Sequence, residues 1–167
     1  MSFGELRRSD RAMSEQDSVA LLERALVGRI GTVDADGTPY VVPLNFVHEH
    51  KRRRVHIHLA RQRGHLASNL EFSSKVCFEV DEPGELIATG DAGCNTSQLF
   101  ESVVCFGRAQ VVSDEGERER IARLFLRKYI DEQMPGRMYD AELVVLNETA
   151  FVTVEIGVLT GKRRSAP

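Results

Sequence analysis

The stretch GRIGTVDADGTPYVVPLNFVHEHKRRRVHIHL, from Gly28 to Leu59, decides the fold because it predicts three adjacent antiparallel strands. The first, residues 28–33, meets the second, residues 38–47, across DADG, and an Asp-Gly pair between β-rich runs is a strong hairpin signal. The third, residues 54–59, alternates apolar and polar side chains with the two-residue period of a strand. We expect a second hairpin tip at residues 49–53.

Pro43 lies in the middle of the second strand, where a sheet ladder needs an N–H group that proline lacks. This part of the strand is therefore an edge, a bulge, or a place where something other than a strand does the pairing. Free backbone groups at Pro43, Leu44 and Asn45, with the Asn45 side-chain amide, can meet the polar rim of a flat heterocyclic ligand. A bulge at a barrel corner explains the same residues equally well.

Length and composition predict one soluble domain, since 167 residues with 42% hydrophobic and 28% charged residues can bury a sizeable core. The net charge of -3 argues against both disorder and a basic nucleic-acid-binding protein. Three cysteines, Cys77, Cys94 and Cys105, form no close pair and fit the reduced thiols of a cytoplasmic protein. We found no export signal or membrane-spanning stretch, so no membrane partner and no nucleic-acid partner is expected.

The other elements follow from caps and periodicity. Ser14 and Asp114, each with an acidic residue three positions later, predict two helix starts, the first helix running to about Val27. Leu66 and Leu70 predict a short helix, and alternating residues predict strands at 75–81, 102–112 and 151–159, with a bulge at Gly107. Six short strands with inserted helices indicate a small, mainly β barrel, closed or partly open, because closure removes exposed edges.

Two further segments suggest a site. Residues 82–97, rich in glycine with one proline, are predicted to be a long loop that covers something. Arg61, Arg63, Gly64 and His65 stand at the start of the short helix, where unpaired N–H groups, the helix dipole and basic side chains favour a phosphate. A solvated basic loop is the competing interpretation.

All five histidines lie between His48 and His65. The pairs His48/His50 and His56/His58 each point two imidazoles to one face of a strand, so zinc, iron or haem ligation was considered. Repulsion from the neighbouring KRRR turn disfavours a metal site, and so does the lack of an acidic second-sphere partner apart from Glu49, which is expected on the opposite face. No metal ligand is assigned. The sequence contains no nucleophile elbow, paired carboxylates, Walker loop or dinucleotide-binding glycine fingerprint, which leaves hydrolase chemistry without a candidate.

The segments GTVDADGTPYVVPLNFV, VHIHLARQRGHLASNL, KVCFEVD, FESVVCFGRA and TGKR, in this order, resemble the flavin-binding split-barrel proteins related to pyridoxamine 5'-phosphate oxidase, in particular their Nim-type nitroimidazole-resistance branch. The resemblance covers Arg11 to about Arg163. It implies a six-stranded antiparallel split β-barrel, a homodimer, and FMN bound in a groove at the subunit interface, with the cofactor supplying the chemistry. The expected organisation is a flexible lead-in (1–13), one split-barrel flavin-binding domain (14–163) and a tail (164–167).

Residue by residue, the resemblance implies a flavin-ring strand at Val42, Pro43, Leu44 and Asn45, and an active-site histidine at His58. It implies that the segment around the ribityl chain and phosphate consists of Leu59, Ala60, Arg63, Gly64 and His65. The partner chain would contribute Phe100 to Ser102 and Lys162. His65 departs from the family pattern, in which lysine or arginine usually follows the glycine. Arg61 or Arg63 could compensate for it.

These observations favour an FMN-dependent oxidoreductase that passes electrons to a small-molecule acceptor, such as a nitroaromatic compound, stacked near His58. The imidazole could donate a proton or orient the substrate, or it could simply line the groove. The alternatives are a non-catalytic flavin, haem or deazaflavin carrier and, third, a metal protein. The apolar residues Val76, Phe78 and Val80 with Val104 and Phe106 exceed what one small barrel interior should hold, which predicts a symmetric dimer.

Overall fold

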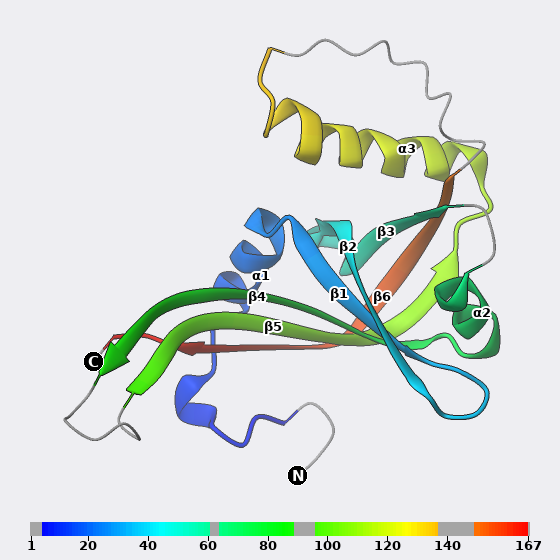
Figure 1. The fold of residues 1–167 in the computed structure, drawn as a ribbon. Helices are drawn as coiled ribbons and strands as arrows, with labels where there is room; N and C mark the ends of the chain where they lie inside the picture. The colour runs from blue at the N-terminus through cyan, green and yellow to red at the C-terminus, as the bar shows by residue number, and fades with distance from the viewer. Residues whose placement is uncertain (1–4, 61–63, 89–95, 137–148, 167) are drawn as a thin grey trace.

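The computed structural model describes residues 5–60, 64–88, 96–136 and 149–166. Within these residues, six antiparallel strands form a barrel in the order β1-β2-β3-β6-β5-β4 (Figure 1). The strands are β1 (Val27–Val33), β2 (Pro39–Glu49), β3 (Arg54–Ala60), β4 (Lys75–Ala88), β5 (Thr96–Val111) and β6 (Thr149–Arg164). The helices are α1 (Glu15–Arg24), α2 (His65–Phe72) and α3 (Glu115–Leu126), with the π-helical turn η4 (Arg127–Asp131) and the 3-10 turns η1 (Ser9–Arg11) and η2 (His50–Arg52).

The local signals of the sequence act as predicted. Gly37 has a φ of 84°, and the Asp34 carboxylate accepts hydrogen bonds from the backbone of Asp36 and Thr38, so the DADG turn joins β1 to β2. The Ser14 hydroxyl and the Asp114 carboxylate cap α1 and α3 by accepting from the backbone three residues on. Helix α1 ends earlier than expected, at Arg24, because Val27 already belongs to β1. No helix of the described segments is long and apolar enough to cross a membrane.

The barrel interior is filled from alternate positions of the strands. Val76, Phe78 and Val80 of β4 are buried there, as the alternation predicted. Their partners from β5 are Val103 and Cys105, whereas Val104 and Phe106 lie half-buried on the other face. Because successive side chains of a strand point to opposite faces, the β4–β5 register decided this choice. Helix α1 adds Leu21 and Leu22 to the same core cluster.

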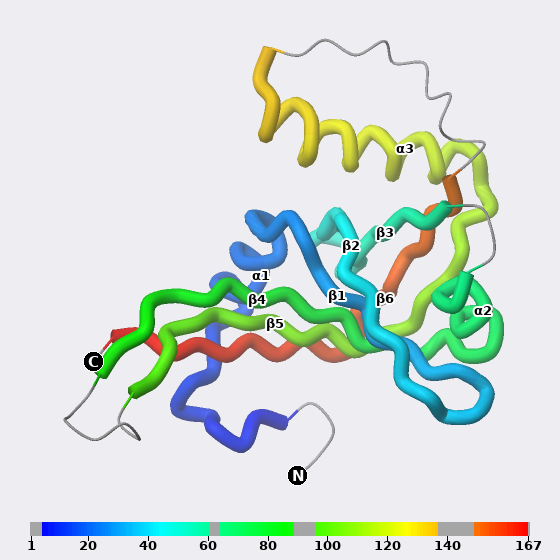
Figure 2. The backbone as a smooth tube through the Cα atoms, in the orientation of Figure 1, coloured from blue at the N-terminus to red at the C-terminus, as the bar shows by residue number. Residues whose placement is uncertain are grey.

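The covering loop expected at residues 82–97 is wrong for the part of this segment that the structure describes. Strand β4 continues to Ala88, β5 starts at Thr96, and the two strands pair at residues 82–83, 86–88 and 96–97, whereas residues 89–95 of the expected loop lie outside the described residues. A register shift between Pro83 and Leu86 absorbs the proline and glycine that predicted a loop. As a result, β4, β5 and the end of β6 run beyond the barrel as a long three-stranded ribbon (Figures 1 and 2).

Gly107 marks the predicted bulge, since the β5–β6 register shifts between Phe106 and Gly107. A Cβ atom at this position would lie 2.2 Å from the carbonyl oxygen of Glu155, which belongs to the backbone and cannot turn aside. Gly107→Ala should therefore lower the free energy of unfolding by about 1–3 kcal/mol, as overpacking of a buried site does. Urea denaturation measures the change.

Gly116→Ala is the matched control for this substitution. Its Cβ would meet only the Asp114 side chain, at 3.5 Å, and Gly116 lies within α3, where alanine is the better helix former. The control should be neutral or slightly stabilising. If Gly107→Ala costs no more than the control, the bulge has room for a side chain and the steric account is wrong.

Candidate functional site

Strands β2 and β3 pair only close to their shared hairpin, from Phe46↔Ile57 to Glu49↔Arg54. Further out, β2 keeps β1 as its partner and β3 keeps β6. Within the described part of the chain, residues 42–45 of β2 and 58–60 of β3 therefore each have an edge that no strand covers. These two edges define a split in the barrel wall.

The split brings together seven of the residues predicted for the site. Val42, Leu44 and Leu59 are half-buried and pack on the core, whereas Pro43, Asn45, His58 and Ala60 are exposed. The β1–β2 ladder passes through Pro43↔Arg29 without a register shift, so the bulge interpretation is excluded and Pro43 lies on a strand edge. The Asn45 side-chain amide is less free than expected, because it donates to the carbonyl oxygen of Leu26 at 3.0 Å.

The start of α2 lies beside the same strand. Gly64 is the N-cap residue and is exposed, and a Cβ atom on it would meet no atom of the described residues within 4 Å. The ring of His65 lies 5.5 Å from that of Tyr40 in β2, measured between centroids. The first N–H groups of a helix have no helical acceptor, which makes this position suitable for an anion. Arg61 and Arg63, the other predicted phosphate contacts, lie outside the described residues.

His58 is in contact with helix α3. Its ring meets that of Phe125 edge-on, with centroids 5.0 Å apart and an interplanar angle of 90°. Partial burial by such contacts lowers the pKa of His58, which keeps the imidazole neutral at neutral pH. Phe125 also stacks on Tyr129, whose hydroxyl accepts from the N–H of Phe46 at 2.9 Å and lies 2.7 Å from the carbonyl oxygen of Leu26.

His56 does not share the exposed position of His58, although the strand period puts both on one face. It is fully buried, with Nδ1 2.9 Å from the Thr153 hydroxyl and Nε2 3.0 Å from the Glu49 carboxylate. Arg120 of α3 holds Glu49 through two hydrogen bonds of 3.1 and 2.9 Å. Sequence reasoning missed this cluster. The one signal in the sequence was the hairpin register, which places Glu49 diagonally opposite His56. Arg120 and Thr153 are far from both residues in the sequence, so no local pattern connects them to the cluster.

The charges of this cluster are adjusted by burial and by hydrogen bonds. Burial lowers the pKa of His56, although Glu49 opposes the effect. For Glu49, burial disfavours the charged form, but hydrogen bonds from His56 and Arg120 outweigh it and lower the pKa. A carboxylate only accepts hydrogen bonds, so His56 carries its proton on Nε2 and its Nδ1 accepts from the Thr153 hydroxyl.

Two further basic side chains lie on the inner side of β2. The Nδ1 atom of His48 is buried and has no hydrogen-bond partner among the described residues, and burial, with repulsion from His50 and Lys128, lowers the pKa of His48 to about 4. Lys128 is buried with its Nζ 4.1 Å from the ring centroid of Phe46, and burial lowers its pKa to about 8. In the described part of the chain, no three His, Cys, Asp or Glu side chains form a group that could hold a metal ion.

The last two predicted residues, Ser102 and Lys162, are not near the split of their own chain. They pair with each other across β5 and β6, where the Ser102 hydroxyl lies 3.4 Å from the Lys162 carbonyl oxygen. Both belong to the three-stranded ribbon (Figure 1), and the Lys162 ammonium lies 5.7 Å from the ring centroid of Phe100. One chain therefore assembles the split without them.

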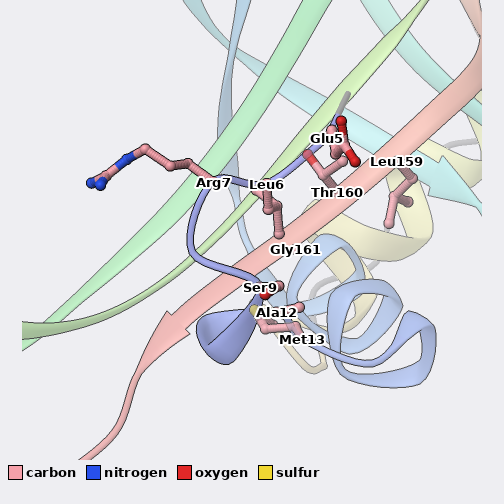
Figure 3. A pocket seen from close by; sticks show the side chains of 9 residues that line it. All are labelled: Glu5, Leu6, Arg7, Ser9, Ala12, Met13, Leu159, Thr160 and Gly161. Carbon is pink, nitrogen blue, oxygen red and sulfur yellow. The ribbon is translucent and has the colours of Figure 1, made fainter. Parts of the chain in front are cut away.

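A separate surface pocket of about 700 Å³ lies between residues 5–13 and β6 (Figure 3). It is open, and a hydrogen bond from the Met13 N–H to the Gly161 carbonyl oxygen joins its two walls. It contains none of the predicted site residues. The lining residues are Glu5, Leu6, Arg7, Ser9, Ala12, Met13, Leu159, Thr160 and Gly161.

The fold and the split define a split-barrel protein. The chain belongs to the pyridoxamine 5'-phosphate oxidase family, whose sequence model matches residues 14–163. No curated protein matches the chain.

Solved structures share the fold. A candidate 5-nitroimidazole antibiotic resistance protein from Bacteroides thetaiotaomicron is 22% identical, with a TM-score of 0.74 over 91% of this chain and 86% of that one. The flavocytochrome Anf3 from Azotobacter vinelandii is 25% identical, with a TM-score of 0.81 over 98% of this chain and 73% of that one. A FAD-binding protein from Mesorhizobium loti is 23% identical, with a TM-score of 0.66 over 93% and 98% of the two chains.

The electrostatics around Lys128 predict a pH-dependent stability. Its pKa falls from 10.5 to about 8 on folding, so only the unfolded chain binds the proton between these values, and stability should rise with pH across this window. Below about pH 8 the full cost of burying the charge applies, and above about pH 10.5 it is gone. Relative to Lys128→Met, the wild type should gain up to about 3 kcal/mol between these limits, measured by urea denaturation.

Lys75→Met, which removes an exposed lysine of β4, is the control and should follow the wild-type curve. Parallel curves for the wild type and Lys128→Met would mean that burial does not change the proton affinity of Lys128.

Proposed function

We propose that this protein binds FMN in the split between β2 and β3 and acts as an oxidoreductase on a small organic acceptor. The pair of uncovered strand edges beside the exposed start of α2 carries this proposal. Strand edges present N–H donors and C=O acceptors, which match the polar rim of a flavin ring. Family membership supports a flavin, and the similar structures include a FAD-binding protein and a flavocytochrome.

The residues of the split fit the parts of the cofactor. The half-buried Val42 and Leu44 offer an apolar floor for the ring, and the edge at Pro43 and Asn45 offers polar groups for its rim. Leu59 and Ala60 lead from His58 toward the start of α2, where Gly64, His65 and Arg63 would hold the phosphate. Bound FMN supplies transfer of one or two electrons. His58 would orient the acceptor or donate a proton to it.

A homodimer belongs to the same proposal. Ser102 and Lys162 lie away from the split of their own chain, so they would reach a flavin only from the partner protomer. The outer face of the sheet supports an interface, because Val104, Phe106 and Val158 are only half-buried there and Val41 and Leu86 are 60% and 73% exposed. Burying these side chains in a symmetric contact would remove apolar surface from water.

The cofactor tests this proposal directly. The purified protein should be yellow, and heat or acid should release FMN at about one molecule per chain, identified by mass spectrometry. Val42→Glu, which places a charge on the apolar floor of the split, should lose the FMN while the far-UV circular dichroism stays unchanged. Val19→Glu, on the half-buried side of α1 and away from the split, is the matched control and should keep the cofactor.

Other outcomes separate the alternatives. Release of FAD would contradict FMN as the cofactor but would still identify a flavoprotein. A Soret band would favour haem. A colourless protein that takes up no added flavin would contradict the proposal. If neither a nitroaromatic nor a quinone acceptor reoxidises the flavin after its reduction with dithionite, the result would favour a carrier without turnover. Sedimentation as a stable monomer at micromolar concentration would exclude a site that is shared between two chains.

His65 provides a prediction about the phosphate. A hydrogen bond from its imidazole to the charged FMN phosphate is worth roughly 1.5–3 kcal/mol. His65→Ala should therefore weaken FMN binding by about ten-fold or more, whereas His65→Lys, which keeps a donor at this position, should bind FMN at least as tightly as the wild type. Fluorescence quenching of free FMN measures each affinity.

Riboflavin, which lacks the phosphate, is the matched ligand control and should bind equally well to the wild type and to both variants. An unchanged FMN affinity in His65→Ala would show that His65 does not contact the phosphate and would leave Arg61 or Arg63 to hold it.

A further inference from the structure

Helix α3 is attached to the barrel at two places of different character. One is apolar, where Ile121, Ala122 and Phe125 pack on Phe151 of β6. The other is polar and buried, and runs from Thr153 through His56 and Glu49 to Arg120, with every contact between 2.9 and 3.1 Å. We call this second contact the anchor. It links β6, β3, β2 and α3 in one chain of hydrogen bonds.

Two further contacts hold the anchor. Arg120 also donates twice to Glu117 in its own helix, at 2.7 Å each, and Arg52 approaches Glu49 at 3.3 Å. His56 has no exposed surface, so if Glu49 is lost, no water can accept the hydrogen bond from its Nε2–H group. Truncating one partner of the partly buried, hydrogen-bonded pair of Glu49 and Arg120 leaves the other charge uncompensated, which favours detachment of the element that carries it.

Phe125 lies on the next turns of the same helix and is the side chain through which α3 meets His58. The helix is therefore fixed by Arg120 close to the hairpin end of β3, and it touches the exposed histidine further along the same face of this strand. Any movement of α3 away from the barrel breaks the contact between Phe125 and His58 together with the anchor.

We propose that the anchor formed by Thr153, His56, Glu49 and Arg120 positions α3 so that Phe125 covers one side of His58, and that it thereby controls the access and the protonation of this histidine. Arg120 and Glu49 are positioning residues, because they touch neither His58 nor the split. The consequence for catalysis rests on the proposed function. The coupling between the anchor and His58 does not, because it concerns the protein without any cofactor.

The sign of the effect follows from the groups around His58. Phe125 of α3 and the paired Phe151 of β6 are its apolar neighbours, and no charged side chain of the described residues contributes to its pKa shift. Partial burial lowers this pKa, so uncovering the ring should raise it. A direct electrostatic effect has the opposite sign, because removal of a carboxylate such as Glu49 destabilises an imidazolium. A rise of the His58 pKa in Glu49→Gln therefore reports movement of α3 and not the loss of the Glu49 charge.

The test is a histidine NMR titration of the flavin-free protein. In Glu49→Gln the titration midpoint of His58 should rise toward that of an exposed imidazole, and the contacts between the Phe125 and His58 rings should weaken. Phe125→Ala should raise the midpoint in the same way without disturbing the anchor. Glu49→Gln should then add no further rise in the Phe125→Ala background, because the two changes act through one contact.

Arg123→Gln is the matched control, since it removes an arginine of the same helix whose ion pair with Glu119 lies on the exposed side. It should leave the His58 midpoint unchanged. If Glu49→Gln does not fold, Arg120→Lys, which keeps the charge but loses the two-pronged contact, is measured in its place.

An unchanged or lowered midpoint in the folded anchor variants would overturn the proposal, and so would a full additional rise in the double variant. Failure of the proposed function is distinguishable, because a protein that binds no flavin can still show the expected rise.

Discussion

The structure depends on the divergence of β2 and β3. The two strands share a hairpin but pair for only four residues each, after which β2 follows β1 and β3 follows β6. A closed sheet satisfies its backbone groups by pairing every edge, so an opening of this kind leaves donors and acceptors that something else must satisfy. The hairpin register holds the edges in place. Because β1 pairs with β2 and β6 pairs with β3 along these residues, both strands stay part of the sheet beside the split.

Helix α3 gives the outer face of β3 two environments within three residues. His56 is buried and hydrogen-bonded on both ring nitrogens, whereas His58 is exposed at the margin of the helix. A buried polar group is tolerated only when it is paired, and here the Glu49 carboxylate of β2 and the Thr153 hydroxyl of β6 supply the partners. The same helix therefore makes one histidine structural and leaves the other accessible to a ligand in the split.

The correct predictions and the errors have a common physical basis. The DADG hairpin, the two helix caps and the bulge at Gly107 depend on a few adjacent residues, and all of them were found where the sequence placed them. The segment 82–97 was misjudged because proline and glycine indicate irregular backbone without saying whether it is a loop or a bulge within a ladder. Pairing with β5 decided that question. The edge position of Pro43 was predicted as one of three alternatives, and only the uninterrupted ladder with β1 excluded the bulge.

The sequence by itself determined the strands, the turns, the caps and the family, because these follow from short-range preferences and from the order of the motifs. It also placed residues 42–45 and His58 on neighbouring strands. Only the tertiary structure decided which polar residues of β3 are buried, which face of β5 is inside, and where the free edges lie. The reason is that burial depends on partners from distant elements, as in the contact between His56 and Thr153, 97 positions apart. No local period carries information over that distance.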